Sequence, residues 1–533
     1  MKKRKLRAHR EKPPKSAKPK RRRRSGYAEE LLKNAQRNHD AVAQDILTEF
    51  GLPQNYPAEV EQAAALIREE ITEADVEGRE DFRVITTFTI DPKDAKDFDD
   101  ALSLRPTNDG LWEVGVHIAD VTRYVETDEI IDREAFGRAT TVYLVDRTIP
   151  MLPEKLSNQL CSLRQDEDKL CFSVIFSLND RAEIQDARIV RTVIRSNRRF
   201  TYEEVQNVIE TGEGEFQHEI LKLNELAKLL RDKRFADGAI DFDRFEVKFD
   251  IDEKGKPLSV FFYETKEANH LIEEFMLLAN RHVAEFIGKK TKGRTKNTFV
   301  YRIHDQPDPD KIRSFSDFIG RFGYKLKTTG SKRDLTKNIN QLLDKSKGKP
   351  EQNLIETLAV RSMQKAVYST HNIGHYGLAF PYYTHFTSPI RRYPDMMVHR
   401  LLTHYLAGGR SVNHELLEDR CKHCSAMEQL ATNAERASIK LKQVEFMSDK
   451  IGQVFNGIIT GVTEWGLYVE LIANKCEGLI SMRDLKGDYY ELDEKNYCLT
   501  GKYHKTTYRL GDPITVQIAF ANLQRRQLDF TPA

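Results

Sequence analysis

The stretch TIDPKDAKDFDD, residues 89–100, contains five aspartates and continues an apolar run, VITTFTI, that begins at residue 84. Asp97 and Asp99 are two positions apart, so their carboxylates point to the same side of an extended chain. Like charges about 4 Å apart repel by several kcal/mol at an intermediate dielectric, and a hard divalent cation such as Mg²⁺ or Mn²⁺ removes that cost. The stretch therefore predicts either a cation site or a solvated acidic surface loop.

The bend of this loop decides how many carboxylates meet. Asp100 points away from Asp99 in an extended chain, and Asp91 must fold back to join Asp97. An EF-hand is excluded, because the glycine and the closing glutamate of its loop are missing. Mg²⁺ held by few carboxylates completes its shell with water and phosphate oxygens, which favours phosphodiester chemistry.

The segments around the aspartates predict an α+β protein. Residues 84–90, 101–104 and 111–119 are rich in β-branched and aromatic residues, as strands are. Apolar residues at three- and four-residue spacing predict helices over much of residues 27–80 and 200–450. We therefore expect a mixed sheet with packed helices.

The residue pattern of the sequence changes near residues 448–452, where we expect a domain boundary. Short strand-like segments separated by glycines follow, which indicates an all-β domain. Before this boundary, one helical pattern has a continuous apolar stripe, which we expect to face the core. The stripe consists of Leu271, Ile272, Phe275, Leu278, Ala279 and Phe286.

The composition is that of a globular protein rather than a membrane protein. Hydrophobic residues make up 39% and charged residues 31% of the 533 residues. No stretch approaches the roughly 18 consecutive apolar residues of a membrane span. The basic N-terminal segment does not lead into an apolar one, so we expect no secretory signal and no membrane binding, and a cytoplasmic location.

Residues 1–26 contain fourteen Lys or Arg residues and one Glu, a formal charge of +13. Because the whole chain carries +2, the remaining residues carry −11. The segment is nearly free of large apolar residues, so we expect a disordered arm. Such an arm attracts nucleic acid, structured RNA or the ribosome. Alternatively, it only increases solubility.

Six cysteines are scattered along the chain, which favours a reducing compartment over a disulfide framework. Cys421 and Cys424 have the spacing of half a zinc site, but they lie in a helical pattern without a second close pair. We therefore expect structural cysteines rather than zinc ligands.

Several separate motifs resemble the RNB family of exoribonucleases, the ribonuclease II and ribonuclease R type. The aspartate stretch is similar to the family signature, and VGVHIADV at residues 114–121 and TVYLVDRTIPMLPEKLSNQLCSL at residues 141–163 follow in the family order. HFTSPIRRYPDMMVHRLL at residues 385–402 is especially specific. The resemblance implies a catalytic site that binds Mg²⁺, or Mn²⁺, through four aspartates: Asp91, Asp97, Asp99 and Asp100.

The resemblance also implies roles for other side chains. Arg391 takes the place of an arginine that contacts phosphate at the active site, and Arg392 beside it is expected to contact RNA. Tyr143 takes the place of a tyrosine that stacks on a base near the scissile end, and Glu435 falls at another active-site position. Taken singly, Tyr143 could instead be a core residue, and either arginine could pair with Asp395.

The C-terminal segment resembles an S1 domain, an RNA-binding barrel of the OB type. Phe455, Trp465 and Tyr468 are expected to stack on bases, although one or two of them could belong to the barrel core. Strand alternation favours exposure of Trp465 or Tyr468. The expected order of domains is a disordered basic arm (1–26), a helical connector (27–80), an RNB catalytic domain (81–448) and an S1 RNA-binding domain (449–533).

The activity implied by the resemblance is that of a Mg²⁺-dependent, processive 3′-to-5′ exoribonuclease. We expect it to act as a monomer on single-stranded RNA with a free 3′ end, to release nucleoside 5′-monophosphates, and to degrade structured RNA with a 3′ overhang. Ribonuclease R usually begins with two cold-shock barrels, which the mostly helical or basic residues before the catalytic domain do not match. We therefore expect a short form or a fragment.

Two other functions compete with this one. An RNA-binding protein with an inactive nuclease domain would have lost one or more cluster aspartates, yet all four are present. An RNA chaperone or ribosome-associated factor would depend on the basic arm and the S1 segment alone. Mg²⁺-dependent release of mononucleotides distinguishes the enzyme from both.

Overall fold

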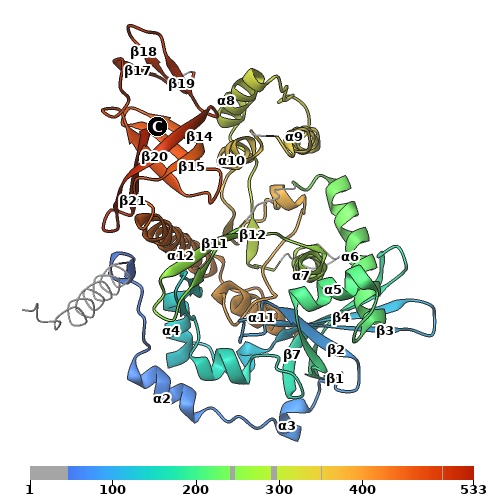
Figure 1. Cartoon of the computed structure of the whole chain (residues 1–533). Helices are drawn as coiled ribbons and strands as arrows, with labels where there is room; N and C mark the ends of the chain where they lie inside the picture. Colours follow the sequence, from blue (N-terminus) through green and yellow to red (C-terminus); the bar gives the residue numbers. More distant parts are fainter. Residues whose placement is uncertain (1–45, 241–245, 290–296, 350, 495) are drawn as a thin grey trace, which may run out of the picture. The chain divides into compact units, whose positions relative to one another are not determined.

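The computed structural model describes residues 46–240, 246–289, 297–349, 351–494 and 496–533. The predicted basic arm, residues 1–26, and the first part of the predicted connector lie outside the described residues. The described part of the connector is helical at residues 46–49 and includes the short helices α2 (Ala58–Leu66) and α3 (Glu73–Val76) (Figure 1).

A seven-stranded mixed sheet lies at the centre of the first domain, with the strand order β1-β8-β7-β4-β3-β2-β9. The five middle strands pair antiparallel, whereas β1 and β9 are parallel to their neighbours. The predicted mixed sheet is thus confirmed. The strands are β1 (Glu80–Asp81), β2 (Thr87–Asp91), β3 (Asp100–Pro106), β4 (Trp112–Ala119), β7 (Asp168–Leu178), β8 (Ile184–Arg195) and β9 (Arg198–Thr201).

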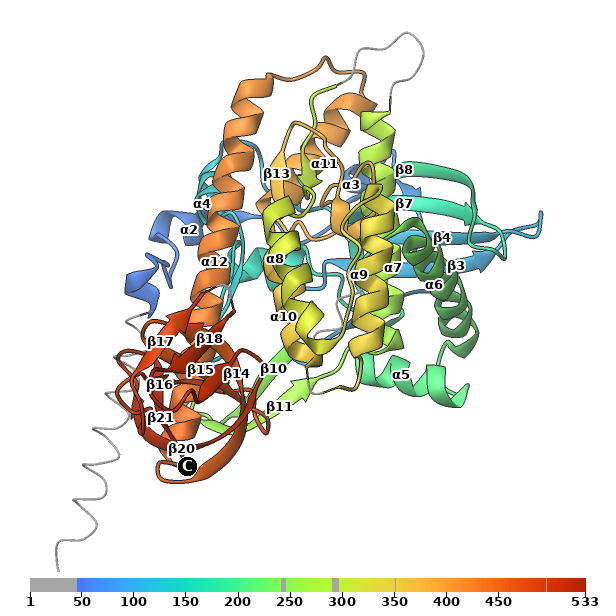
Figure 2. The same cartoon turned by 90° about the horizontal axis from the view of Figure 1, so that it is seen from above.

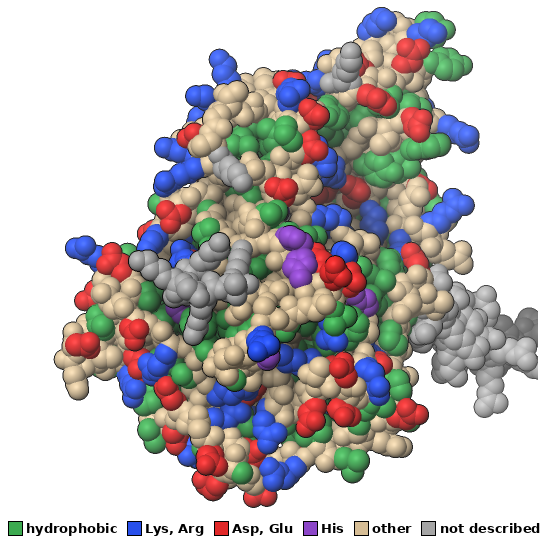
Figure 3. Space-filling view, turned by 180° about the vertical axis from the view of Figure 1, so that it is seen from behind, with side chains coloured by type: hydrophobic (Ala, Val, Ile, Leu, Met, Phe, Trp, Pro, Cys, Tyr) green, Lys and Arg blue, Asp and Glu red, His purple; other side chains and the backbone are tan. Residues whose placement is uncertain are grey.

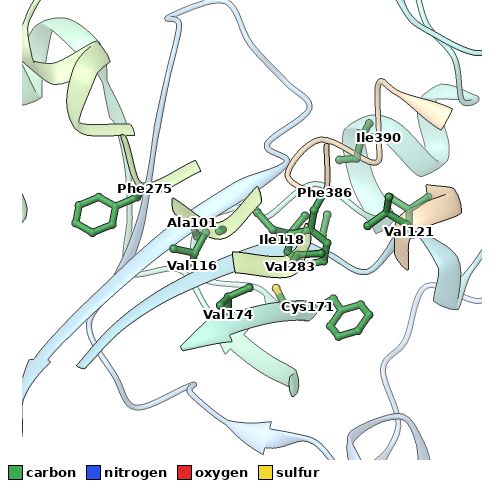
Figure 4. Close-up of a cluster of buried hydrophobic side chains, with 14 of the residues drawn as sticks. Ala101, Val116, Ile118, Val121, Cys171, Val174, Phe275, Val283, Phe386 and Ile390 are labelled. Atoms are coloured by element: carbon green, nitrogen blue, oxygen red, sulfur yellow. The ribbon is translucent and has the colours of Figure 1, made fainter. Parts of the chain in front are cut away.

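Both faces of the middle of the sheet are covered, because β4 is buried at every position after Trp112. On one face, Val116 and Ile118 belong to an apolar cluster that also contains Phe275 of helix α7 (Glu267–Gly288) (Figure 4). Ile390 belongs to the same cluster, so the motif at residues 385–402 packs against the sheet that carries the aspartate loop.

A row of buried polar side chains crosses neighbouring strands on the other side of β4. His117 makes hydrogen bonds to Ser103 Oγ, 2.9 Å from Nε2, and to Ser173 Oγ, 2.8 Å from Nδ1. Burial lowers the pKa of His117 to about 3, so the imidazole is neutral. A Cβ at Gly115 would lie 2.4 Å from His117 Nε2, and only glycine leaves room for this row.

Helices and hairpins surround the sheet, with α5, α6 and α7 in contact with β2, β3 and β4 in that order (Figure 1). The predicted stripe on α7 is buried at Leu271, Phe275 and Ala279, but the prediction was wrong for Phe286, which is 51% exposed. The further elements are α4 (Ile130–Arg138), α5 (Tyr202–Thr211), α6 (Gln217–Asp237), α11 (Tyr393–Leu406), η1 (Val121–Arg123), η2 (Lys155–Leu160), η4 (Tyr376–Leu378), and the pairs β5 (Val142–Tyr143) with β6 (Thr148–Ile149), β10 (Glu246–Ile251) with β11 (Pro257–Tyr263), and β12 (Tyr301–Ile303) with β13 (Val367–Ser369).

A group of helices between β12 and β13 has a hydrophobic core of its own. It includes Phe315, Ile339 and Ile355, one from each of the three longer helices. Leu510, from the C-terminal domain, is buried in the same core. The helices are α8 (Pro309–Ile319), η3 (Gly320–Phe322), α9 (Lys332–Ser346) and α10 (Gln352–Ser362).

A single helix of 35 residues, α12 (His414–Ser448), leads into the C-terminal domain (Figure 2). A closed barrel follows with the strand order β14-β15-β16-β21-β20, which confirms the predicted all-β domain. Val444 and Met447 of α12 pack in the barrel core, although they precede the predicted domain boundary between residues 448 and 449. The position of that boundary therefore stays a prediction. The strands are β14 (Val454–Thr463), β15 (Gly466–Leu471), β16 (Glu477–Ser481), β20 (Pro513–Asn522) and β21 (Gln527–Pro532), with a three-stranded insertion of β17 (Tyr490–Asp493), β18 (Cys498–Gly501) and β19 (Thr507–Arg509).

The surface and the cysteines agree with the composition. Lys and Arg side chains alternate with Asp and Glu over the face seen in Figure 3. All six cysteines are buried and unpaired, and burial raises the pKa of the Cys421 and Cys424 thiols, which disfavours the thiolate that zinc requires. Among the described helices, none has both the length and the apolar character needed to cross a membrane.

Candidate active site

The four predicted aspartates line one cavity of about 830 Å³. Asp91 is the last residue of β2 and Asp100 the first of β3, and these two strands pair antiparallel. Asp97 and Asp99 come from the loop that joins them. The turn between two adjacent strands therefore brings together carboxylates that an extended chain would point to opposite sides.

Hydrogen bonds hold the loop in place. Ser162 Oγ accepts from the Phe98 N–H at 3.0 Å and donates to the Lys96 carbonyl at 2.8 Å. The Ala119 N–H donates to the Asp99 carbonyl at 2.8 Å. The loop is thus fixed both to β4 and to the segment at residues 141–163, which is another of the motifs that resemble the RNB family.

Asp99 is the most deeply buried of the four carboxylates, with a residue exposure of 5%. Its Oδ1 accepts the backbone N–H of Ile390 at 2.9 Å, and its Oδ2 lies 3.5 Å from Arg391 Nε. Burial raises its pKa well above the ordinary value, although Arg391 and the Ile390 N–H oppose this shift. An ionised Asp99 therefore depends on nearby positive charge.

Burial also raises the pKa of Asp91, Asp97 and Asp100, and the charge of Asp91 adds to the shift of Asp100. Asp91 Oδ2 is buried and has no hydrogen-bond partner among the described residues. An orphaned carboxylate oxygen beside three more carboxylates is the donor set that a hard divalent cation requires. Asp94, by contrast, is exposed.

No three of the four carboxylates offer oxygens that all lie within 4.8 Å of one another. Among the described residues, the one group of three or more potential ligands whose atoms all lie within 4.8 Å is elsewhere, at His371, His414 and Glu418. The residues present fit a cation, held either directly or through water.

The motif at residues 385–402 forms a turn that presents its two arginines differently. Asp395, which is fully buried, accepts the Ser388 N–H at 2.8 Å and Arg392 Nη2 at 2.9 Å. Arg392 therefore forms an ion pair with Asp395, which was the alternative to the predicted RNA contact. It also lines the cavity. The Arg391 side chain is 43% exposed and lies beside Asp99.

Tyr143 and Glu435 are neighbours. Tyr143 lines the cavity and is 44% exposed, so it is not a core residue. Its backbone N–H donates to Glu435 Oε1, 3.2 Å away on α12. The Thr141 N–H donates to the Arg391 carbonyl at 3.0 Å, which joins the Tyr143 segment to the arginine turn. Glu435 thus accepts a hydrogen bond from the backbone of Tyr143, the residue predicted to stack on a base.

The cavity also contains residues that the sequence analysis missed, among them Tyr202, Lys248 and Asn280. Asn280 was detectable, because it is a polar residue on the buried side of α7. Its Oδ1 accepts the Phe386 N–H at 2.7 Å, and its Nδ2 donates to Thr387 Oγ1 at 3.3 Å. Nothing in the local pattern distinguishes Tyr202 or Lys248.

The three barrel aromatics differ in exposure. Trp465, between β14 and β15, is 68% exposed, whereas Phe455 is half-buried and packs against the barrel core. Tyr468 is also half-buried. Two further tyrosines of the three-stranded insertion, Tyr489 and Tyr503, are 75% and 68% exposed and were not predicted.

Comparison with known families identifies the domains. A model described as "RNB domain" matches residues 79–408, and one described as "S1 RNA binding domain" matches residues 448–531. The chain belongs to the RNB family. The RNB match contains the aspartate loop and the arginine turn, and the S1 match contains the barrel.

Curated relatives of this RNB-family chain carry the name ribonuclease R. Ribonuclease R of Aquifex aeolicus is 38% identical over 516 residues, which cover 95% of this chain and 72% of that protein. Ribonuclease R 1 of Lactococcus lactis is 37% identical over 91% of this chain, and the match covers 60% of its own length. This chain therefore spans well under two thirds of the Lactococcus relative.

Solved structures agree with this assignment. RNase R of Mycoplasma genitalium in complex with ribose methylated single-stranded RNA has a TM-score of 0.85 at 26% identity, over 92% of this chain and 77% of that chain. The same protein in complex with double-stranded RNA has a TM-score of 0.79 at 25% identity, over 92% and 82% of the two chains. The RNB and S1 folds are thus shared over most of the described residues.

Proposed function

We propose that this RNB-family chain is a Mg²⁺-dependent exoribonuclease that shortens single-stranded RNA processively from the 3′ end and releases nucleoside 5′-monophosphates. One observation carries the proposal: the half-exposed Arg391 guanidinium lies 3.5 Å from the buried Asp99 carboxylate, in the cavity that three further aspartates line. A carboxylate cluster beside a fixed guanidinium suits a phosphodiester that arrives with a divalent cation.

The cation is Mg²⁺, or Mn²⁺ in its place, held by Asp91, Asp97, Asp99 and Asp100 directly or through water. The unpartnered Asp91 Oδ2 and the raised pKa values of the four carboxyls support this, because a cation lowers the cost of keeping all four ionised. When bound, the cation supplies activation of water and stabilisation of the leaving oxygen.

The side chains around the cluster orient the RNA. Arg391 donates to the non-bridging oxygens of the scissile phosphate and offsets the charge that grows there in the transition state. Tyr143 stacks on a base near the scissile end, a contact that tolerates any sequence because every base has a π-face. Glu435 accepts from the Tyr143 backbone N–H and so positions the segment that carries the ring.

The barrel adds affinity for the strand before it enters the cavity. Trp465 is the most exposed of the three predicted aromatics and is the stacking residue that we favour. Phe455 and Tyr468, both half-buried, would contact RNA by their exposed edges while they complete the barrel.

An assay of RNA labelled separately at its 3′ and 5′ ends tests the proposal with two matched variants of the full chain. Asp99→Asn removes one cluster charge with little change in volume, and we expect the rate of mononucleotide release to fall on the order of 100-fold or more. Asp94→Asn removes an exposed charge from the same loop and should leave the rate near that of the wild type. Release at the wild-type rate by Asp99→Asn, or labelled mononucleotide first appearing from the 5′ end, would reject the proposal.

Substrate range is a separate part of the proposal. We propose that duplexes with a 3′ overhang are degraded, and that residues 1–26, with their charge of +13, attract structured RNA or the ribosome. A comparison of the full chain with a Δ1–26 variant on one such duplex tests both, since loss of duplex degradation with retained single-strand degradation would assign the arm this role.

We also propose a cellular compartment and an oligomeric state. Six buried, unpaired cysteines support a reducing compartment such as the cytoplasm. We propose that the protein acts as a monomer.

A further inference from the structure

Two histidines and a glutamate meet away from the aspartate cavity. His371 follows β13, whereas His414 and Glu418 belong to the first turns of α12. One ligand atom from each side chain lies within 4.8 Å of the others. The His371 and His414 ring centroids are 4.5 Å apart, and His371 Nδ1 lies 4.0 Å from Glu418 Oε2.

Helix geometry places two of the three groups on one face. His414 and Glu418 are four positions apart, a spacing that puts both side chains on the same side of a helix. The helix start is already capped, because Asn413 Oδ1 accepts the Leu416 N–H at 3.0 Å. His414 and Glu418 are therefore not needed as capping residues.

Thr370 connects Glu418 to His414 and determines which imidazole nitrogen is available. Its hydroxyl donates to Glu418 Oε2 at 2.5 Å and lies 2.8 Å from His414 Nε2. Because the single hydroxyl proton goes to the carboxylate, His414 Nε2 must be the donor to the Thr370 oxygen. The lone pair of His414 Nδ1 is then free for a ligand, as in metal sites where the second ring nitrogen is hydrogen-bonded.

Hydrogen bonds from two neighbouring residues hold the Glu418 carboxylate in place. Ser369 Oγ donates to Oε1 at 3.0 Å, and the Thr370 N–H donates to Oε2 at 2.6 Å. The carboxylate is thus oriented before any ligand binds.

We propose that His371, His414 and Glu418 form a second metal site that binds a borderline divalent transition cation, with Zn²⁺ as the reference ion. Two imidazole nitrogens and one carboxylate oxygen suit Zn²⁺, with water at the remaining position, and they differ from the all-oxygen set of the aspartate cavity. His371 is exposed and lies at the surface, so the ion has a path to the site. The bound ion ties the segment after β13 to the start of the helix that leads into the barrel.

Zn²⁺ binding to the full chain tests this site directly. Chelator-treated protein is dialysed against Zn²⁺ with excess Mg²⁺ present to occupy the aspartate cavity, and bound zinc is measured by elemental analysis. We expect one zinc per chain in the wild type and in the control His218→Ala, which removes another exposed histidine. We expect this zinc to be lost in His371→Ala, whose replaced side chain is 70% exposed. Equal zinc in the wild type and His371→Ala would overturn the proposal.

Two further measurements separate a built site from casual surface binding. Thr370→Val should weaken Zn²⁺ affinity by roughly 10- to 100-fold, because it removes the hydroxyl that orients His414 and Glu418. Zn²⁺ should raise the Tm of the wild type but not that of His371→Ala, because a ligand that binds only the folded state stabilises it. A Tm that rises equally in both proteins would contradict the site, as would unchanged affinity in Thr370→Val.

Discussion

Asp99 accepts a hydrogen bond from the backbone N–H of Ile390, 2.9 Å away, although 291 positions separate the two residues. Ile390 is buried in the same apolar cluster as the strands that carry the aspartate loop. Packing of that side chain therefore sets the position of the next residue, Arg391, relative to the carboxylates. The hydrogen bond joins the two most specific motifs of the chain into one site.

Arg391→Ala should abolish most activity without loss of stability. The side chain is 43% exposed, and bound Mg²⁺ supplies the positive charge that the buried Asp99 carboxylate loses with it, but the transition-state phosphate loses its cationic partner. We expect the kcat for RNA hydrolysis to fall about 100- to 1,000-fold, and Arg391→Lys to recover only part of it, because lysine cannot donate in a bidentate fork. Single-turnover kinetics measures the effect, and a variant that changed only KM would contradict it.

Arg392→Ala should instead destabilise the fold. Arg392 donates to Asp395 at 2.9 Å, and Asp395 is fully buried, so the variant leaves a carboxylate buried without its partner. We expect the free energy of unfolding to fall by about 3–5 kcal/mol, which urea denaturation measures. A stable Arg392→Ala protein with weakened RNA binding would favour the RNA contact expected from the sequence.

Stability of the metal-free protein should fall as pH rises. Burial raises the pKa of Asp100 in the folded state, with the charge of Asp91 adding to it. Above the unfolded-state pKa of about 3.9 the folded protein then holds protons that the unfolded chain has released. The free energy of unfolding therefore decreases as pH rises from there through the raised folded-state pKa.

Asp100→Asn tests this pH dependence. We expect it to flatten the fall by roughly 1.4 kcal/mol for each unit of pKa difference removed, and Mg²⁺ to stabilise the wild type more than the variant. Urea denaturation in chelator at several pH values measures the slope. The exposed Asp94→Asn should keep the wild-type slope, and an equal slope in Asp100→Asn would show that the carboxyl is not perturbed.

Tyr143→Ala should lower the affinity for the 3′-terminal nucleotides of RNA, whereas Tyr143→Phe should not. Stacking depends on the ring, and its loss costs about 1–3 kcal/mol per base. The Glu435 contact is to the backbone N–H, so both variants retain it. Fluorescence anisotropy with a short RNA and the inactive Asp99→Asn background measures the affinity. Equal affinities for the two variants would remove Tyr143 from the binding site.

Short-range pattern determined a large part of this protein. The β-branched and aromatic residues at 111–119 predicted β4, the glycine-separated segments after residue 451 predicted the barrel, and the five aspartates marked the loop. These features depend on the periodicity of single elements and on the chemistry of neighbouring residues, so they can be read along the chain. Resemblance then added Arg391, Tyr143 and Glu435, which no local pattern singles out.

Tertiary structure alone decided which side chains meet. Packing of Ile390 placed Arg391 beside Asp99, burial of Asp395 turned Arg392 inward, and the crossing of β13 with α12 brought His371 to Glu418. Such contacts join distant segments, and the sequence predicts each segment's form but not the geometry of their approach. Burial, which the sequence indicates only on average, also set the raised pKa values of the aspartates in the candidate cation site.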